Sequence, residues 1–406
     1  MRQYPGGPPQ PPYDNAGWTL PIQMGVACDR INEPFDAKLE KIEKIPYPPV
    51  PAKQGVANYV VLGSQVNASY AIVFSLLKDA KADIWRTKSK VMRKGFDIPA
   101  GSFVIQNTPE VKKALPALLA KYNLAVIDLD DAADIAKAPL KFHRIGLYQS
   151  WRGNMDEGWT RYFFDDMGIP FKTLHNEDIK GTKEKKVDLR ADYDVIVFAD
   201  ENGNVIKSGR PSGGPGGAPG AAPTGTQARQ PASTTPPEYE GGIGQEGVDA
   251  LKAFVEKGGI VVLLNQACTL AFNEYDVPAR NALQNVDRTR FFCPTSILRI
   301  QVDNETPIGY GMPKEAGAMF VNSLALDTSQ PGFEWDRKVV ATYPEDNILL
   351  SGWLLGEDVI SRKAVVVDTT YKDGHIILIG IRCQNRAQSH GTYKFLLNAL
   401  LYPEKD

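Results

Sequence analysis

Short runs of wholly apolar residues, each set beside a helix-like segment, constrain the fold more than any other feature. Four such runs are "IGLY" (145–148), "VIVF" (195–198), "IVVLL" (260–264) and "IILIGI" (376–381). A strand that is apolar at every position must be covered on both faces, as in parallel sheets flanked by helices. We therefore predict an α/β domain over residues 140–406, with a mainly parallel sheet and helices on both sides.

Two further strand-helix-strand patterns precede this region and predict a smaller α/β domain over residues 56–138. The segment 109–123 carries apolar residues on one helical face, between the strand-like segments 101–106 and 124–129. Residues 1–55 are rich in proline and predict an extended strap, with one short helix near 35–44.

The segment from 207 to about 235 is rich in Gly, Pro, Ala and Ser and poor in large apolar side chains. Such a composition cannot bury enough apolar surface to offset the entropy of ordering, so we expect a disordered insertion within the larger domain. Two interpretations stay open: a lid or partner tether, and a tolerated expansion of a loop.

Charge and composition exclude several classes of partner. The chain has 46 basic and 48 acidic side chains and a formal charge of −2, so nothing favours nucleic acid. Its longest apolar runs have the length of strands, which predicts no membrane insertion. The four histidines, His143, His175, His375 and His390, do not follow a zinc-ligand spacing, and "GGPGGAPG" lacks the residues of a phosphate loop. We predict neither a metal nor a cofactor.

The four cysteines, Cys28, Cys268, Cys293 and Cys383, are widely separated and read as free thiols. Of these, Cys268 follows the strand 260–264 and precedes a helix, which is where a nucleophile elbow would lie. Its neighbours are Ala267 and Thr269, however, whereas the strained turn of an elbow suits glycine. A packed structural thiol is therefore the alternative to a nucleophile.

The loops after the predicted parallel strands should meet at one edge of the sheet, the usual ligand crevice of such folds. The last of these loops contributes His390, a candidate base for Cys268, and three groups that could hold an anion. A helix beginning near 158 supplies further candidates, whose acidic members could equally act as helix caps. The predicted rim residues are Asp156, Glu157, Trp159, Arg161, Gln266, Arg382, Arg386 and Gln388.

Several segments together resemble the region downstream of the catalytic domain in large bacterial zinc carboxypeptidase-like proteins. They are "YDNAGWTLPIQMGV", "RIGLYQSWRGNMDEGWTRYFFDDMGIPFKTL", "PPEYEGGIGQEGVDALKAFVEKGGIVVLLN", "FFCPTSILRIQVD", "LLSGWLLGE" and "RAQSHGTYKFLLNALL". The resemblance implies a Rossmann-like, class I glutamine amidotransferase-like domain in the distal half, with Cys268 and His390 near the positions of the nucleophile and the histidine.

The resemblance also implies that the zinc-binding catalytic domain is absent from this chain, because its HxxE pair cannot be found here. A zinc carboxypeptidase catalytic domain, on the same or an adjacent chain, would then be the partner, and an extracytoplasmic or secreted location is implied. Two hypotheses follow. The chain is either a non-catalytic accessory region that binds a small peptide or carbohydrate, or a cysteine-dependent amidotransferase or hydrolase that uses Cys268 and His390.

Overall fold

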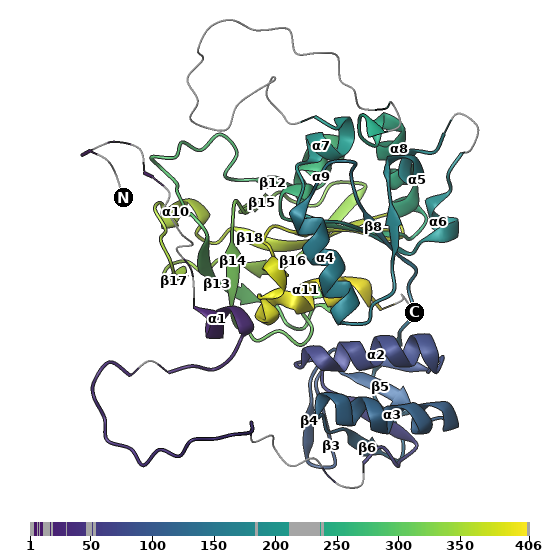
Figure 1. Cartoon of the computed structure of the whole chain (residues 1–406). Coiled ribbons are helices and arrows are strands. Elements are labelled where there is room, and N and C mark those ends of the chain that lie inside the picture. Colours follow the sequence, from purple (N-terminus) through teal and green to yellow (C-terminus); the bar gives the residue numbers. More distant parts are fainter. Residues whose placement is uncertain are drawn as a thin grey trace, which may run out of the picture.

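A computed structural model describes most of the chain (Figure 1). The described residues are 4–5, 7, 9–10, 17, 19–29, 31–45, 51, 54–182, 186–210, 236 and 239–403. The chain has a mixed α/β fold with one large and one small sheet. Of the predicted insertion 207–235, residues 211–235 lie outside the described residues, whereas 207 and 208 belong to helix α7 (Gly203–Ser208).

Half of the large sheet is parallel. Its parallel strands are β9 (Lys172–Leu174), β8 (Ile145–Tyr148), β10 (Val195–Phe198), β11 (Ile260–Leu264) and β19 (Gly374–Ile379), in that spatial order. Numbered along the chain, this is the order 2-1-3-4-5. The connection that leaves β8 leads to β9 on one side, whereas the next connection leads to β10 on the other side. The boundary between β8 and β10 is therefore the switch point where doubly wound sheets form their crevice.

The other half of the large sheet is antiparallel and corrects the expectation of a mainly parallel sheet. The path continues from β19 through β18 (Ala364–Tyr371), β16 (Trp335–Thr342), β13 (Ser296–Val302) and β14 (Glu315–Phe320). Short strands at its margin are β12 (Ala279–Asn281), β15 (Leu326–Thr328) and β17 (Leu349–Ser351). Local sequence does not fix strand direction, because pairing joins segments that are distant along the chain.

Helices cover both faces of the parallel half of the large sheet. This explains why every residue of strand β11 is apolar. Ile260, Val262 and Leu264 enter the core cluster on one face, whereas Val261 and Leu263 enter the cluster on the other. The first face is covered by α4 (Met155–Asp166) and α11 (Tyr393–Leu400). The second is covered by α5 (Asn176–Lys180), α6 (Leu189–Asp192), α7, α8 (Gly244–Glu256) and α9 (Cys268–Glu274).

The small sheet has the strand order β6-β1-β5-β2-β7 and only antiparallel pairs. Its elements are β1 (Tyr59–Leu62), α2 (Asn67–Asp79), β2 (Ile84–Thr87), β5 (Phe103–Gln106), α3 (Pro109–Tyr122), β6 (Ile127–Leu129) and β7 (Lys137–Pro139), with a hairpin of β3 (Val91–Arg93) and β4 (Phe96–Ile98). Apart from β7 and the hairpin, this is the β-α-β-β-α-β arrangement of ferredoxin-like units.

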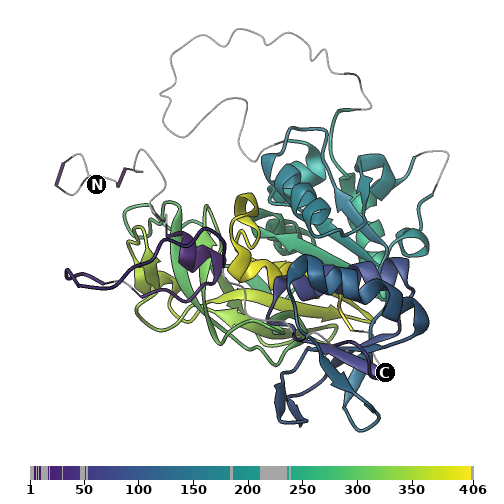
Figure 2. The ribbon, with the colours of Figure 1, turned by 60° about the horizontal axis from the view of Figure 1, so that its bottom comes forward.

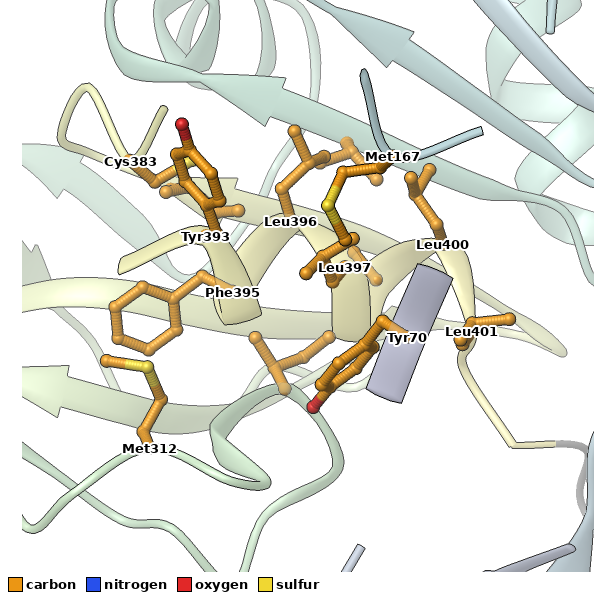
Figure 3. Close-up of a cluster of buried hydrophobic side chains, with 14 of the residues drawn as sticks. Tyr70, Met167, Met312, Cys383, Tyr393, Phe395, Leu396, Leu397, Leu400 and Leu401 are labelled. Carbon is orange, nitrogen blue, oxygen red and sulfur yellow. The ribbon is translucent and has the colours of Figure 1, made fainter. Parts of the chain in front are cut away.

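The small sheet docks on the large one through α2, which lies against α11. Figure 3 shows Tyr70 of α2 beside the leucines of α11. Here Arg86 of β2 is almost wholly buried, and its Nη1 donates to Asn398 Oδ1 at 2.8 Å. The Tyr70 hydroxyl donates to the same oxygen at 2.8 Å, and Asn398 Nδ2 donates to the carbonyls of Ile308 and Tyr310. This buried network links both sheets through one side chain of α11.

The N-terminal strap departs from expectation. Its helix is α1 (Leu20–Met24), which packs against β14 and the 3₁₀ turn His390–Thr392 before α11 (Figure 2). Residues 35–44 form no helix. Apolar side chains in this stretch have no cover, and Leu39 is 85 % exposed. A single short helix is marginal without tertiary packing, so the amphipathic pattern alone does not form one.

Candidate functional site

Loops from four parallel strands meet at their carboxyl ends, as predicted. Ser150 follows β8, Asp200 follows β10, Asn265 follows β11, and Arg382 follows β19. Asp200 is at the centre of this group. Its Oδ2 accepts a hydrogen bond of 2.8 Å from Asn265 Nδ2, and its Oδ1 accepts one of 3.1 Å from the backbone N–H of Gln266. We call Asp156, Asp200, Asn265, Gln266 and Arg382 the rim network.

Arg382 holds two carboxylates of the rim network. Its Nε lies 2.7 Å from Asp200 Oδ2, a close ion pair without the angle of a hydrogen bond, and its Nη1 lies 3.4 Å from Asp156 Oδ2. Burial raises the pKa of Asp200 and of Asp156, and the charge of Arg382 opposes that rise for both. The positive charge of Arg382 thus stabilises the charged forms of two carboxylates that lie close together at the buried edge of the sheet.

Asp156 reaches the rim because Asn154, not an acidic residue, caps helix α4. The Asn154 side chain accepts hydrogen bonds from the backbone N–H groups of Asp156 and Glu157. Relieved of capping, Asp156 is free to face Arg382. Glu157 instead forms an ion pair with Arg161 one turn along the helix, and Arg161 also donates to Thr173 of β9 at 3.0 Å. Glu157 and Arg161 therefore brace the helix against the sheet edge.

The strained turn after β11 is centred on Asn265. This residue follows the last residue of the strand and has φ of +49°, in the left-handed region that asparagine tolerates better than most side chains. Its Nδ2 also lies 3.3 Å from the carbonyl oxygens of Val321 and Asn322, which fixes the side chain. The left-handed residue of this strand-to-helix turn is thus an asparagine, and Cys268 comes three residues later.

Cys268 lies under the rim. It is 0 % exposed, and its Sγ donates to the Leu263 carbonyl at 3.3 Å. Burial raises the pKa of this thiol far above its ordinary value, which suppresses the reactive thiolate. These surroundings suit the packed structural thiol that was the alternative interpretation.

His390 lies on the other side of the sheet. It begins the short 3₁₀ turn before α11, and its ring stacks on Tyr393 at 4.7 Å between centroids. Tyr393 belongs to the core cluster of the α4 and α11 face, whereas Cys268 belongs to the cluster of the opposite face. Burial also lowers the pKa of His390. The structure therefore does not bring the two residues of the predicted pair together.

Within the rim network, the Gln266 side chain also donates from Nε2 to the Asn322 carbonyl at 2.6 Å. The remaining predicted rim residues are spread out. Arg386 and Gln388 are exposed on the loop before α11, and Trp159 packs edge-on against Tyr162 on α4. Sequence reasoning missed Gln384, which is buried and donates to Thr160 at 2.7 Å. It also missed Asp200 and Glu201, which lie in the loop after β10. The missed signal was "VIVFADEN", in which acidic residues directly follow an apolar strand.

Beside the rim network lies an aromatic group that sequence reasoning also missed. The indole of Trp151, 37 % exposed, stacks on His175 with 3.8 Å between centroids and 10° between planes. Tyr239 meets the indole edge-on at 4.7 Å. We call Trp151, His175 and Tyr239 the aromatic platform. It stands beside Glu201, whose Oε1 accepts a hydrogen bond of 2.9 Å from Ser150, and whose pKa is raised by burial.

Within the described residues, no group of three His, Cys, Asp or Glu side chains is arranged to hold a metal ion. The same residues include no helix of the length and apolar character needed to cross a bilayer.

Comparison with known proteins gives limited information. No family model and no curated protein matches the chain. A cytoplasmic protein from Salmonella typhimurium is 13% identical, with a TM-score of 0.38, over 65% of this chain and 100% of that one. A protein described as ThuA-like from Bacteroides uniformis is 14% identical, with a TM-score of 0.36, over 66% and 93%. A β-galactosidase from Bacillus circulans is 9% identical, with a TM-score of 0.35, over 68% and 33%. These values assign no activity to this chain.

Proposed function

We propose that this chain is a non-catalytic accessory region of a zinc carboxypeptidase-like protein, and that its larger part is a Rossmann-like, amidotransferase-like module that binds a ligand without cleaving it. The parallel strand order 2-1-3-4-5 and the elbow after β11 support the architecture. The association with a zinc carboxypeptidase-like protein rests on the sequence segments that resemble such proteins.

The state of the elbow carries the non-catalytic part of the proposal. In elbow enzymes the backbone N–H after the nucleophile helps to form the oxyanion hole. Here Asn265 stands at the strained position, and the N–H of Gln266 is already hydrogen-bonded to Asp200. A negative charge developing on a substrate would meet a carboxylate instead of a free donor, so stabilisation of an acyl-transfer transition state is lost.

The aromatic platform supports carbohydrate as the ligand class. Exposed aromatic rings stack on the apolar faces of sugars, and nearby polar groups bind the hydroxyls. Trp151 offers such a ring. Ser150 and Arg152 are its neighbours along the chain, and Glu201 accepts a hydrogen bond from Ser150. Trp151 follows β8, one of the two strands at the switch point where folds of this order form their crevice, whereas His175 follows β9 on the other side of β8.

Binding measured by tryptophan fluorescence and calorimetry tests the ligand. Neutral oligosaccharides such as chitotriose and cellotriose are the probes, with an uncharged tripeptide of similar size as the competing class. We expect saturable binding of a saccharide that the substitution Trp151→Ala weakens at least tenfold. Phe96→Ala, which removes a more exposed aromatic ring on the β3–β4 hairpin, is the control. Binding of the peptide alone, or equal binding by Trp151→Ala, contradicts the carbohydrate proposal.

Uncovered apolar side chains of the strap support a protein partner. Ile31, Phe35, Leu39, Ile42 and Ile45 are all more than half exposed. Exposed apolar side chains gathered in one segment are typical of interaction sites. Mixing the chain with the zinc carboxypeptidase catalytic domain encoded with or beside it should give a complex in sedimentation velocity. The double substitution Leu39→Glu, Ile42→Glu should weaken that complex, and absence of any complex with the unaltered chain refutes the association.

A further inference from the structure

A cavity separate from the rim network lies where the strap crosses the junction of the two sheets. Its volume is about 1040 Å³, enough for a small organic ligand. Five parts of the chain form its walls: α1 with the residues after it, the start of α2, the segment from the β13–β14 loop into β14, Leu350 of β17, and the 3₁₀ turn that leads into α11. Much of the lining is apolar and includes Ile22, Met24, Val26, Met312, Ala316 and Leu350.

The strap wall of this cavity is held in place by a close backbone contact. Gly25 ends α1 with φ of +68°, and a Cβ built there would lie 2.9 Å from Cα of Gly391. Only glycine allows both this conformation and this approach. The wall is therefore a fixed part of the fold at this point, where the strap meets the loop that carries His390.

Lys394 is the unusual member of the lining. It is only 6 % exposed, and it sits on α11 among apolar residues. No hydrogen bond or ion pair joins its ammonium group to any residue that the structure describes, and burial alone lowers its pKa to about 8. Its Nζ still reaches the solvent of the cavity, but the apolar neighbours remove part of its hydration, which costs free energy, and no described side chain replaces what is lost.

The acidic side chain nearest in the lining does not serve as that partner. Glu315, from β14, forms an ion pair with Arg299 of β13 on the sheet surface. A second polar group is also unsatisfied: Oδ1 of Asn67, at the start of α2, is buried without a hydrogen bond, while its Nδ2 donates to the His390 carbonyl at 2.9 Å. The cavity therefore presents an ammonium group without an ion-pair partner within a largely apolar wall.

We propose that this cavity binds a monocarboxylate with an apolar body, whose carboxylate pairs with Lys394. The apolar lining takes the body of the ligand, and the ammonium supplies the charge-assisted hydrogen bonds. A fatty acid and the C-terminal end of an apolar peptide share this chemistry. The proposal is independent of the function proposed for the rim and the aromatic platform.

Calorimetry with the full chain at pH 7 tests the proposal and separates the two sources. Decanoate represents the fatty acid, and N-acetyl-Leu-Phe with a free carboxylate represents the peptide. Decanamide and N-acetyl-Leu-Phe amide are matched uncharged probes, and acetate is the probe without an apolar body. We expect at least one of the two carboxylates to bind saturably, at least tenfold more tightly than its amide, and acetate not to bind detectably.

Two substitutions identify the residue. Lys394→Met keeps the length of the side chain and removes the charge, so it should weaken carboxylate binding at least tenfold while leaving amide binding unchanged. Lys78→Met, on an exposed face of α2, should change neither. Thermal melting establishes that each variant is folded, and Lys394→Arg, which retains the charge, should retain binding if Met disturbs the fold. Equal carboxylate binding by folded Lys394→Met, or no saturable binding of either carboxylate to the unaltered chain, overturns the proposal.

Discussion

The backbone N–H of Gln266 donates a hydrogen bond of 3.1 Å to Oδ1 of Asp200. This one contact joins the exit loops of two neighbouring parallel strands and occupies the donor that an elbow enzyme keeps free. Arg382 neutralises the same carboxylate from a third loop. The Asp200 carboxylate at this edge of the sheet is thus held by its own neighbours, which is consistent with a role in binding or in stability.

Because Asn265 lies in the left-handed region, a glycine at this position should give a more stable protein than an alanine, the reverse of the usual order within a helix. Asn265→Gly and Asn265→Ala both lose the hydrogen bonds of the side chain, but only alanine is strained at φ of +49°. We expect the alanine variant to be less stable than the glycine variant by about 1 kcal/mol, measured by urea unfolding.

Asn347, at φ of +53° on the surface, provides the control for that ranking. There the glycine and alanine variants should differ by a similar amount, without the further loss of about 1–3 kcal/mol that both Asn265 variants should show from the broken rim network. An Asn265→Ala protein as stable as the unaltered chain would contradict the role given to this turn.

Thiol labelling distinguishes the two interpretations of Cys268. Iodoacetamide at pH 7.5 should modify the exposed Cys28 rapidly, whereas Cys268 and Cys383, both fully buried, should react only as fast as the protein opens. Mass spectrometry of the peptides gives each rate. Rapid labelling of Cys268 in the folded protein, together with an amide-hydrolysing activity that Cys268→Ser abolishes, would instead establish the cysteine-dependent enzyme.

Replacement of Asn398 tests how much the buried network between the two sheets contributes to the stability of the protein. Replacing Asn398 with alanine removes the acceptor of Arg86 and Tyr70 and the donor to two buried carbonyls. Because these groups stay buried, we expect a loss of about 2–4 kcal/mol in the free energy of unfolding. Gln245→Ala, which removes one exposed hydrogen bond on α8, should cost less than about 0.5 kcal/mol. A loss at Asn398 no larger than that would show that the network does not hold the junction.

The lowered pKa of Lys394 predicts a stability difference that depends on pH. The folded protein holds this proton with a pKa of about 8, whereas the unfolded chain holds it with a pKa of about 10.4. Between these values the unfolded state binds more protons, so stability should rise with pH across the window. Below about pH 8 both states carry the charge, and the penalty of burying it is present in full.

The comparison that isolates this effect is between the unaltered chain and Lys394→Met, because other groups titrate equally in both. The methionine variant should be the more stable at pH 7, and its advantage should shrink as the pH approaches 10. Urea unfolding at a series of pH values measures the difference. An advantage that does not change with pH would show that Lys394 keeps an ordinary pKa in the folded protein.

The sequence indicated part of the candidate site because parallel strands end at a common edge. Asp156, Gln266 and Arg382 were placed on that edge from their positions after strands or at a helix start, and they do meet there. The sequence did not indicate that Asn265 adopts the strained backbone conformation after β11. Attention fell on Cys268, whose neighbouring residues do not mark a strained position at 265. His390 was also assigned to the rim, since a position on a loop does not reveal the face toward which the loop folds.

By itself, the sequence determined which segments become buried strands and helices, because a strand that is apolar on both faces can be stable only when both faces are covered. Tertiary structure decided the direction of half the large sheet and the absence of a helix over 35–44. It also decided the chemical state of Cys268 and Lys394. These depend on contacts between residues far apart in the chain, and a pKa responds to the burial and charge of a site, which no local pattern encodes.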